Sequence, residues 1–236
     1  MVLWVFGYGS LIWKAGFEYD DRRVCFIKGY RRVFYQGSTD HRGTPEYPGR
    51  TVTLEPAEGE ICVSSFYNPN AHTTSNVYLY ENLIGFSIIC FLFKKTPLLK
   101  SICFPDCNGW GVAYKVSKEE DEQIALTYLE VREKQYDKKA YLDVYAEPMA
   151  TTPVISGVMV YIASPDKKLN RNYLGPASVE EIAKQIIHAE GPSGPNREYL
   201  FQLEQALLQM GCEDKHVMDL ANEVRRILSE KELTVS

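Results

Sequence analysis

Features that would direct this chain of 236 residues into a membrane or out of the cell are missing from its sequence. Met1 leads straight into fold-forming residues, without the basic n-region, long apolar h-region or small-residue cleavage site of a secretory signal. An apolar run at residues 83–93 is too short to cross a bilayer, which needs about 20 residues. We therefore expect a cytoplasmic protein whose six cysteines are reduced thiols.

Clustered positive charge is also scarce. The formal net charge is −5, the pI is about 5.5, and the basic residues are scattered along the chain. Proteins that bind nucleic acids or anionic membrane surfaces usually carry a basic patch. The composition thus predicts no nucleic-acid partner and no membrane partner.

The paired ligand spacings of structural zinc sites do not occur either. Cys103 and Cys107 are separated by three residues, and Cys90 and His72 lie upstream. Structural zinc sites instead use two pairs of closely spaced ligands. We predict no metal site.

The most informative segment that is present joins an apolar strand to a glycine-rich turn. It reads Val5, Phe6, Gly7, Tyr8, Gly9, Ser10, Leu11. Gly7 and Gly9 can adopt φ values closed to other residues, so successive backbone N–H groups could converge on one anionic group. The alternative is an ordinary turn at a strand end. A nucleotide-phosphate site is disfavoured, because no Lys-Ser or Lys-Thr follows the turn.

A second segment places two carboxylates near the end of a predicted helix. The helix covers residues 119–132, with Ser117 as its expected N-cap. Glu130 and Glu133 are three residues apart and are expected on one helical face. Apolar and aromatic neighbours favour a cleft position for at least one of them, where a raised pKa suits proton transfer. The alternative is a solvated charged face.

Strands and helices are both expected in one hydrophobic core, because 45% of the residues are hydrophobic and the chain is long enough. Strand signals occur at residues 2–6, 24–35, 51–54, 110–116, 140–146 and 154–163. Helix signals occur at residues 119–132, 178–189, 196–210 and 214–228. This pattern by itself predicts an α+β fold.

Ordered sequence blocks narrow this interpretation. They lie at residues 4–14, 35–43, 48–54, 110–114, 128–134, 173–176 and 191–194. In this order the chain resembles the ChaC family of glutathione-specific γ-glutamylcyclotransferases. The resemblance covers nearly the whole sequence except residues 63–109, and it implies a small curled mixed β-sheet or barrel flanked by helices. The substrate cleft would lie where the first strand ends.

The resemblance also implies an activity. The α-amine of the γ-glutamyl unit of glutathione attacks its own γ-carbonyl, which gives 5-oxoproline and releases cysteinylglycine. No water, metal or redox cofactor takes part. We therefore expect glutathione as the small-molecule substrate and no cofactor, while the oligomeric state stays open.

Site residues follow from the matched motifs. The resemblance assigns proton transfer to Glu133 of the Arg-Glu-Lys motif, with Glu130 as an auxiliary or gating acid. It assigns substrate binding and oxyanion stabilisation to the segment from Val5 to Leu11, in which Tyr8 would form a wall of the cleft. Weaker candidates for the lining are Gln36, Arg42, Tyr173 and Tyr199. His41 is interpreted as part of a polar turn beside the site and not as a base.

Residues 63–109 depart from the family pattern. We expect a single domain over residues 1–236 in which this insertion interrupts a hairpin, between Cys62 and Trp110. One interpretation is a loop that docks on a membrane or a partner. The other, favoured by a composition typical of AT-rich codons, is a translated intron. The apolar run within it predicts poor solubility.

Two other functions stay open. The chain could be a cyclotransferase that acts on other γ-glutamyl amino acids or amines. It could also be an inactive splice form that acts by binding a partner, for which the insertion is the sole indication.

Overall fold

The computed structural model describes residues 2–57 and 109–235, which belong to one compact unit. The predictions made for residues 58–108, including most of the insertion and four of the cysteines, lie outside the described residues. Within the described part, no helix is long and apolar enough to cross a membrane. The same part contains no group of three or more histidine, cysteine, aspartate or glutamate side chains that could hold a metal ion.

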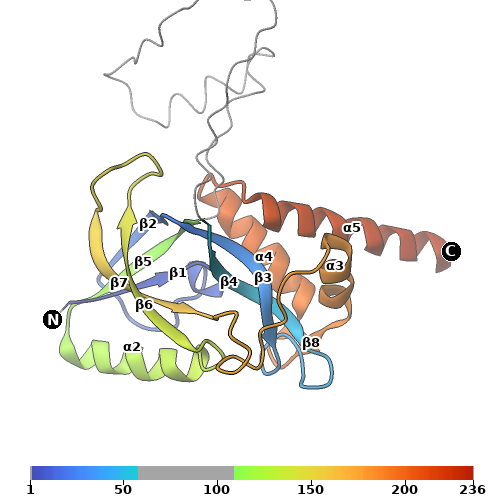
Figure 1. The fold of residues 1–236 in the computed structure, drawn as a ribbon, viewed down its shortest axis with the longest axis horizontal. Helices are drawn as coiled ribbons and strands as arrows, with labels where there is room; N and C mark the ends of the chain where they lie inside the picture. Colours follow the sequence, from blue (N-terminus) through green and yellow to red (C-terminus); the bar gives the residue numbers. More distant parts are fainter. Residues whose placement is uncertain (1, 58–108, 236) are drawn as a thin grey trace, which may run out of the picture. The chain divides into compact units, whose positions relative to one another are not determined.

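Five strands close into a barrel in the order β1-β5-β2-β6-β7 (Figure 1). Their bounds are β1 Leu3–Gly7, β2 Asp21–Ile27, β5 Trp110–Val116, β6 Lys138–Tyr145 and β7 Ile155–Ile162. Strand β1 pairs antiparallel with β5 and parallel with β7, so the sheet is mixed. The predicted α+β fold with a small mixed barrel is confirmed.

A two-stranded ribbon and the helices α3, α4 and α5 lie beside the barrel, and helix α2 packs on the barrel. The ribbon pairs β3 (Tyr30–Ser38) with β4 (Gly49–Pro56). The helices are α2 (Glu119–Arg132), α3 (Val179–His188), α4 (Asn196–Gln209) and α5 (Lys215–Val235). Short elements are the 3₁₀ helix η1 (Ser10–Ile12) and the strands β8 (Glu190–Gly191) and β9 (Gly194–Pro195). In Figure 1, α2 lies below the barrel and α3 to α5 lie on the side of the ribbon.

Helix α3 shows how local sequence sets an element. Ser178 caps its first turn, and the side chain of Glu181 bonds back to the Ser178 N–H, which completes a capping box. Ile182, Ile186 and Ile187 share one face of the helix, and all three are buried, as the spacing predicts. The helix therefore has both a fixed start and a fixed buried side.

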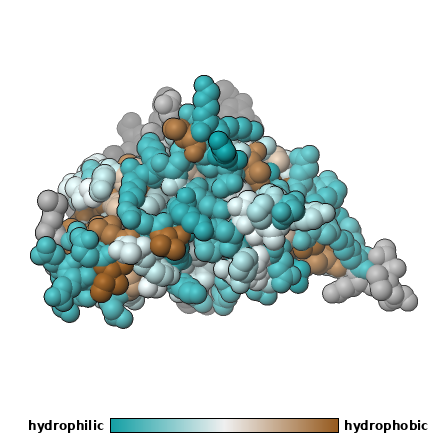
Figure 2. All heavy atoms as spheres, turned by 90° about the horizontal axis from the view of Figure 1, so that it is seen from below, coloured by the Kyte–Doolittle hydropathy of each residue, from teal (hydrophilic) through white to brown (hydrophobic). Residues whose placement is uncertain are grey.

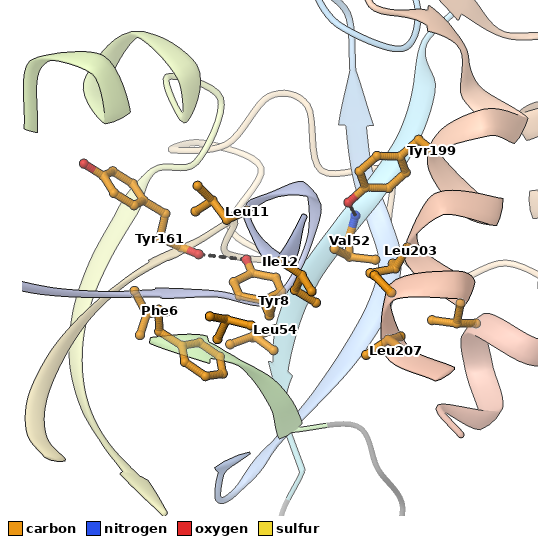
Figure 3. Packing of buried hydrophobic residues seen from close by; sticks show 14 of the residues in the cluster. Phe6, Tyr8, Leu11, Ile12, Val52, Leu54, Tyr161, Tyr199, Leu203 and Leu207 are labelled. Carbon is orange, nitrogen blue, oxygen red and sulfur yellow. Dashed lines mark hydrogen bonds between the residues drawn. The ribbon is translucent and has the colours of Figure 1, made fainter. Parts of the chain in front are cut away.

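One hydrophobic core joins the barrel to the ribbon and the helices. Figure 3 shows Tyr8, from the loop after β1, beside Leu54 of β4, with Phe6 of β1 on one side of them and Leu203 and Leu207 of α4 on the other. Each of these five residues is at most 6% exposed. Burial of one large apolar side chain contributes roughly 1.5–3 kcal/mol. The loop that follows β1 therefore starts from a rigid base.

The face of the described residues drawn in Figure 2 is mostly hydrophilic, with small and separate hydrophobic patches. Scattered apolar residues of this kind are normal for a surface in contact with water. This face offers no large apolar patch of the kind that marks a docking surface.

The strand predicted at residues 24–35 is wrong, because two strands occupy this stretch. The turn between β2 and β3 contains Gly29, whose φ of +75° lies in the left-handed region. Glycine adopts this conformation at little cost, so the chain reverses there. The prediction overlooked this glycine, which lies between two runs of β-branched and aromatic residues.

The ends of α2 and β5 agree with the sequence prediction, but the N-cap does not. Lys118 occupies the N-cap of α2 and gives no side-chain capping bond. Ser117, the predicted N-cap, lies one residue before it, and its backbone N–H donates to Asp20 Oδ2 at 2.7 Å. Four acidic residues in the first turn, Glu119, Glu120, Asp121 and Glu122, complement the positive end of the helix dipole.

The predicted hairpin around the insertion is also wrong. Strand β4 pairs with β3 in the ribbon, whereas β5 pairs with β1 and β2 in the barrel. The connection therefore passes from one sheet to another. Its two described ends still contact the same turn, because Ala57 N–H donates to Gly29 O at 2.9 Å and Gly109 packs against Ile27 O.

Candidate active site

A cavity of about 610 Å³ lies where β1 ends. Its wall is built from the segment after β1, the end of α2, the loop between β3 and β4, the turn between β8 and β9, and α4. Side chains that are far apart in the sequence, such as Tyr8, Glu133 and Tyr199, thus face one space. This is the position that the resemblance implies for the substrate cleft.

Glu133 lies in this cavity at the point where α2 ends. Its N–H still donates to Leu129 O at 2.8 Å, but its own backbone has left the helical conformation. The side chain is 13% exposed. Burial raises the pKa of Glu133 to about 7, opposed by the positive charge of Arg132 and assisted by the negative charge of Asp40. A carboxyl group with this pKa can take up and release a proton near neutral pH.

Glu130 does not accompany Glu133 into the cavity. Its side chain is 63% exposed and forms an ion pair with Lys139, at 3.0 Å. The expectation of one shared helical face is wrong, because the helix ends at Arg132 and Glu133 turns away from the helical path. Glu130 is not among the residues that line the cavity, so its position gives no support to a gating role.

Most of the predicted substrate-binding segment lines the cavity. The lining residues are Phe6, Tyr8, Gly9, Ser10 and Leu11. Val5 and Gly7 do not belong to the lining. Val5 is fully buried in the barrel, between Tyr114 and Met159 of the neighbouring strands. Val5 therefore anchors β1 in the barrel and does not line the cavity.

The two glycines of the segment are needed for space and not for a left-handed backbone. The φ of Gly9 is −120°, and neither glycine has a positive φ, which corrects the sequence expectation. A Cβ on Gly7 would lie 2.3 Å from the Cβ of Leu11. A Cβ on Gly9 would lie 2.9 Å from the hydroxyl of Tyr199 and 3.0 Å from Val52 Cγ2. Close packing of the loop on its neighbours therefore excludes side chains at both positions.

The loop residues Gly9, Ser10 and Leu11, which line this cavity, keep unused backbone donors. Gly9 O and Ser10 O accept bonds from residues 12–14, which closes the turn of η1. No described residue accepts a hydrogen bond from the N–H groups of Gly9, Ser10 or Leu11. Backbone donors without a partner beside a cavity can serve an anionic group.

Arg132 links this loop to Glu133. Its Nη2 donates to Ser10 Oγ at 2.8 Å, and its Nη1 donates to the carbonyls of Lys14 and Ala15 at 2.6 and 3.0 Å. Its Nε lies 3.3 Å from Glu133 Oε1. The sequence prediction did not include this residue, although it precedes Glu133 in the Arg-Glu-Lys motif. Because Ser10 Oγ accepts from Arg132, the hydroxyl proton of Ser10 remains available for another acceptor.

Comparison with known proteins identifies the family. A family model described as "ChaC-like protein" matches residues 3–227. The chain belongs to the ChaC-like family. Among its ChaC-like relatives, "Gamma-glutamylcyclotransferase 2-3" of Arabidopsis thaliana is 55% identical, over 98% of this chain and 93% of the relative. "Glutathione-specific gamma-glutamylcyclotransferase" of Saccharomyces cerevisiae is 35% identical, over 88% of this chain and 86% of the relative.

A solved structure of a ChaC-like relative has the same fold. It is the crystal structure of the yeast γ-glutamyl cyclotransferase specific to glutathione, which matches with a TM-score of 0.67 and 31% identity. The match covers 95% of this chain and 96% of the yeast chain. The resemblance seen in the ordered sequence blocks is therefore confirmed.

Tyrosines form much of the wall of the ChaC-like cavity. Tyr8 donates to Tyr161 O at 2.7 Å, and Tyr136 donates to Val52 O at 2.7 Å (Figure 3 shows the first bond). Burial raises the pKa of both Tyr8 and Tyr136 well above the ordinary tyrosine value, and the Glu133 charge adds to this. The two hydroxyls therefore stay protonated and their protons are already engaged, which suits walls better than proton carriers.

The four weaker candidates divide into two pairs. Arg42 and Tyr199 line the cavity. Gln36 and Tyr173 do not line it. Gln36 is fully buried and exchanges hydrogen bonds with Asn170, and it also donates to Gln135 O at 2.9 Å. The hydrogen bonds of Gln36 thus join two loops, and both Gln36 and Tyr173 lie outside the cavity wall.

A buried arginine that sequence inspection missed supports the loop from behind. Arg32 is fully buried, and its Nε donates to Tyr8 O at 2.7 Å. Its Nη1 forms an ion pair of 2.6 Å with Asp214, and its Nη2 donates to Trp110 O. Asp214 and Trp110 are distant in the sequence, so no local pattern could reveal this network. It fixes the carbonyl of Tyr8 and thereby the direction of the loop.

Proposed function

We propose that this chain cleaves glutathione into 5-oxoproline and cysteinylglycine. The observation that carries the proposal is the buried carboxyl of Glu133, with its pKa of about 7, in the same cavity as the free donors of the Gly9–Leu11 loop. The names of the relatives agree with glutathione as the substrate.

Proton transfer is the task of Glu133 in this mechanism. The γ-glutamyl α-amine arrives as an ammonium ion and is not nucleophilic until it loses a proton. Glu133 in its ionised form accepts that proton, and the freed amine attacks the γ-carbonyl carbon. Glu133 then gives the proton to the departing nitrogen of cysteinylglycine as the old C–N bond breaks. The attacking nitrogen also gives up its second proton, which ends on the released amine, so 5-oxoproline leaves as a neutral lactam and cysteinylglycine as an ammonium ion. A pKa near the working pH suits both directions of transfer.

Charge stabilisation is the task of the loop. The γ-carbonyl oxygen becomes negative when the ring closes, and no acceptor in residues 2–57 or 109–235 takes a hydrogen bond from the N–H groups of Gly9, Ser10 and Leu11. The hydroxyl of Ser10 is held by Arg132 with its proton free. Donors that are oriented before the reaction stabilise such an oxyanion effectively. Reaction within one bound molecule also avoids the entropy of bringing two reactants together.

Further parts of the proposal concern organisation and location. We propose one domain over residues 1–236, interrupted at about residues 63–109, and a cytoplasmic location. Cys25 is a buried free thiol, which supports a reducing compartment.

The test is product analysis. The purified full chain is incubated with glutathione or with γ-glutamyl-alanine, and 5-oxoproline and cysteinylglycine are quantified by chromatography. Equimolar formation of the two products from glutathione is expected. Faster release of 5-oxoproline from γ-glutamyl-alanine would indicate the broader cyclotransferase activity. No 5-oxoproline from either substrate would contradict the proposal and favour an inactive form.

A further inference from the structure

Two sequence blocks pack together at the rim of the cavity without a role in the chemistry above. They are residues 39–43, after β3, and residues 191–194, between β8 and β9. Ser193 N–H donates to His41 O at 2.9 Å. A Cβ on Gly191 would lie 2.5 Å from that same carbonyl oxygen, so the close contact requires glycine. The second block therefore clamps the first.

Arg42 is held in this clamp with most of its donors unused. Its Nη1 donates to Pro195 O at 3.2 Å, and its backbone N–H donates to Ser38 Oγ at 3.0 Å. The side chain is 13% exposed, and it lines the cavity. Glu198 Oε2 lies 3.8 Å from Nη1, which is beyond hydrogen-bond distance. No described residue accepts a hydrogen bond from Nε or Nη2, although a guanidinium has five donors.

Arg42 and Glu133 line the same cavity from different elements, the loop after β3 and the end of α2. Arg132, with its Nε 3.3 Å from Glu133, already provides the arginine beside the reacting centre. The Cζ of Arg42 lies over the ring of Tyr199, 6.0 Å from its centroid. The hydroxyl end of Tyr199 points to Gly9 and Val52, as Figure 3 shows for Val52. Tyr199 therefore lies next to both the loop and Arg42.

We propose that Arg42 binds the carboxylate at the glycine end of glutathione. This inference rests on the proposed function and adds a second subsite to it. A free guanidinium edge matches a carboxylate with two parallel hydrogen bonds, and partial burial strengthens them. An extended tripeptide spans roughly 10 Å, enough to reach past one aromatic ring from the reacting amine. γ-Glutamyl amines lack this carboxylate, so Arg42 would favour glutathione over them.

The test measures binding and so does not depend on turnover. The full chain with Glu133→Gln is titrated by calorimetry with glutathione and with glutathione carrying a C-terminal glycinamide. Proteins with Arg42 should bind glutathione roughly 10- to 100-fold more tightly than the amide, as expected for charge-assisted hydrogen bonds. Arg42→Met should bind both ligands with the same affinity, close to that of the amide.

Matched variants separate a subsite from a structural role. Glu198→Gln removes the exposed neighbouring carboxylate and should leave the preference for glutathione unchanged or slightly larger. Arg42→Lys keeps the charge without the planar fork and should reduce the preference. If Arg42→Met does not fold, an unchanged preference in Arg42→Lys overturns the proposal.

Two further results would also overturn it. One is equal affinity for glutathione and the amide in the protein with Arg42. The other is an equal loss for both ligands in a folded Arg42→Met protein. Failure of the proposed function is recognised separately, since the unaltered chain would then form no 5-oxoproline whichever ligand it binds.

Discussion

Arg132 and Glu133 are neighbours in the sequence, and their side chains face each other in the cavity, with Nε 3.3 Å from Oε1. Each side chain is 13% exposed. Burial alone disfavours the charged carboxylate, and the guanidinium restores part of its stability. The same guanidinium holds Ser10 Oγ at 2.8 Å. One residue thus couples the proposed base to the loop that would bind the substrate.

Replacement of Glu133 by glutamine should nearly abolish turnover. The amide keeps the size of the side chain but cannot accept a proton from the substrate amine. Loss of a general base costs about 10²- to 10⁴-fold, and the second duty as acid places the expected loss in the upper part of this range. The measurement is the rate of 5-oxoproline formation. Glu130→Gln, which changes an exposed glutamate on the same helix, serves as the control and should have little effect. Turnover of Glu133→Gln near that of the unaltered chain would rule out the assignment.

The same variant should be more stable at high pH. The folded-state pKa of about 7 lies above the ordinary value of 4.5, so the folded protein keeps a proton that the unfolded chain has lost. Stability therefore falls as the pH rises across this window. The difference between 7 and 4.5, at about 1.4 kcal/mol per pKa unit, corresponds to about 3 kcal/mol. Urea unfolding of Glu133→Gln and the unaltered chain should differ by about this amount at pH 8 and hardly at pH 4. An equal difference at both pH values would contradict this prediction.

Replacement of Arg132 by methionine should shift the pH profile of catalysis. The positive charge lowers the pKa of Glu133, so its removal raises that pKa. The base is active when ionised, and the acidic limb of kcat/KM should move to higher pH. Above this limb we expect a residual loss of roughly tenfold, from the lost bond to Ser10.

Two variants test whether the charge causes this shift. Arg132→Lys keeps the charge and should leave the acidic limb near its original position. Arg22 donates to Ile12 O from outside this cavity, at 3.3 Å, so Arg22→Met is a matched arginine control. A lower kcat/KM for Arg132→Met with an unmoved limb would mean that Arg132 only supports the loop.

Replacement of Gly9 by alanine should lower activity while the fold is kept. The new Cβ would lie 2.9 Å from the hydroxyl of Tyr199, so the loop must move and its free N–H groups with it. Overpacking of this kind costs about 1–3 kcal/mol. The measurements are kcat/KM and circular dichroism.

A second substitution can relieve the contact. Tyr199→Phe removes the hydroxyl, so the double variant with Gly9→Ala should recover part of the lost activity. Gly29→Ala, at a distant turn with φ of +75°, should reduce stability by about 1 kcal/mol and leave kcat/KM unchanged. Absence of recovery in the double variant would show that Tyr199 is not the obstacle.

Removal of residues 63–108 should preserve catalysis and raise the melting temperature. The described ends, Ala57 and Gly109, both contact the turn at residues 27–29, so a short connection can join them. A shorter loop also lowers the free-energy cost of loop closure, by roughly 2 kcal/mol. The measurements are the melting temperature, solubility and the rate of 5-oxoproline formation.

The exact junction provides the control for this deletion. A Cβ at position 109 would lie 2.1 Å from Ile27 O. A deletion that also removes Gly109 places Cys62 next to Trp110 and should be less stable than one that keeps the glycine. Loss of activity in a folded protein that keeps Gly109 would show that the removed segment takes part in the cleft.

Elements with strong local signals were predictable from the sequence. Helix α2 and strand β5 have the predicted bounds, because a run of acidic residues starts the helix and β-branched and aromatic residues mark the strand. The motif that contains Glu133 was also visible, since the ordered blocks identify the family. The turn at Gly29 was missed because a single glycine is a weak signal between two runs of β-branched and aromatic residues.

The sequence by itself determined the fold class, the family and the carboxylate proposed for proton transfer. Only the tertiary structure decided how that carboxylate is tuned and what surrounds it. Arg132 reaches Ser10 across 122 positions, and Arg32 reaches Asp214 across 182. Local patterns arise from residues within one or two turns of each other. Contacts over such separations depend on the packing of the barrel, ribbon and helices together, and this packing determines why position 9 must be glycine and why Glu133 has a pKa of about 7.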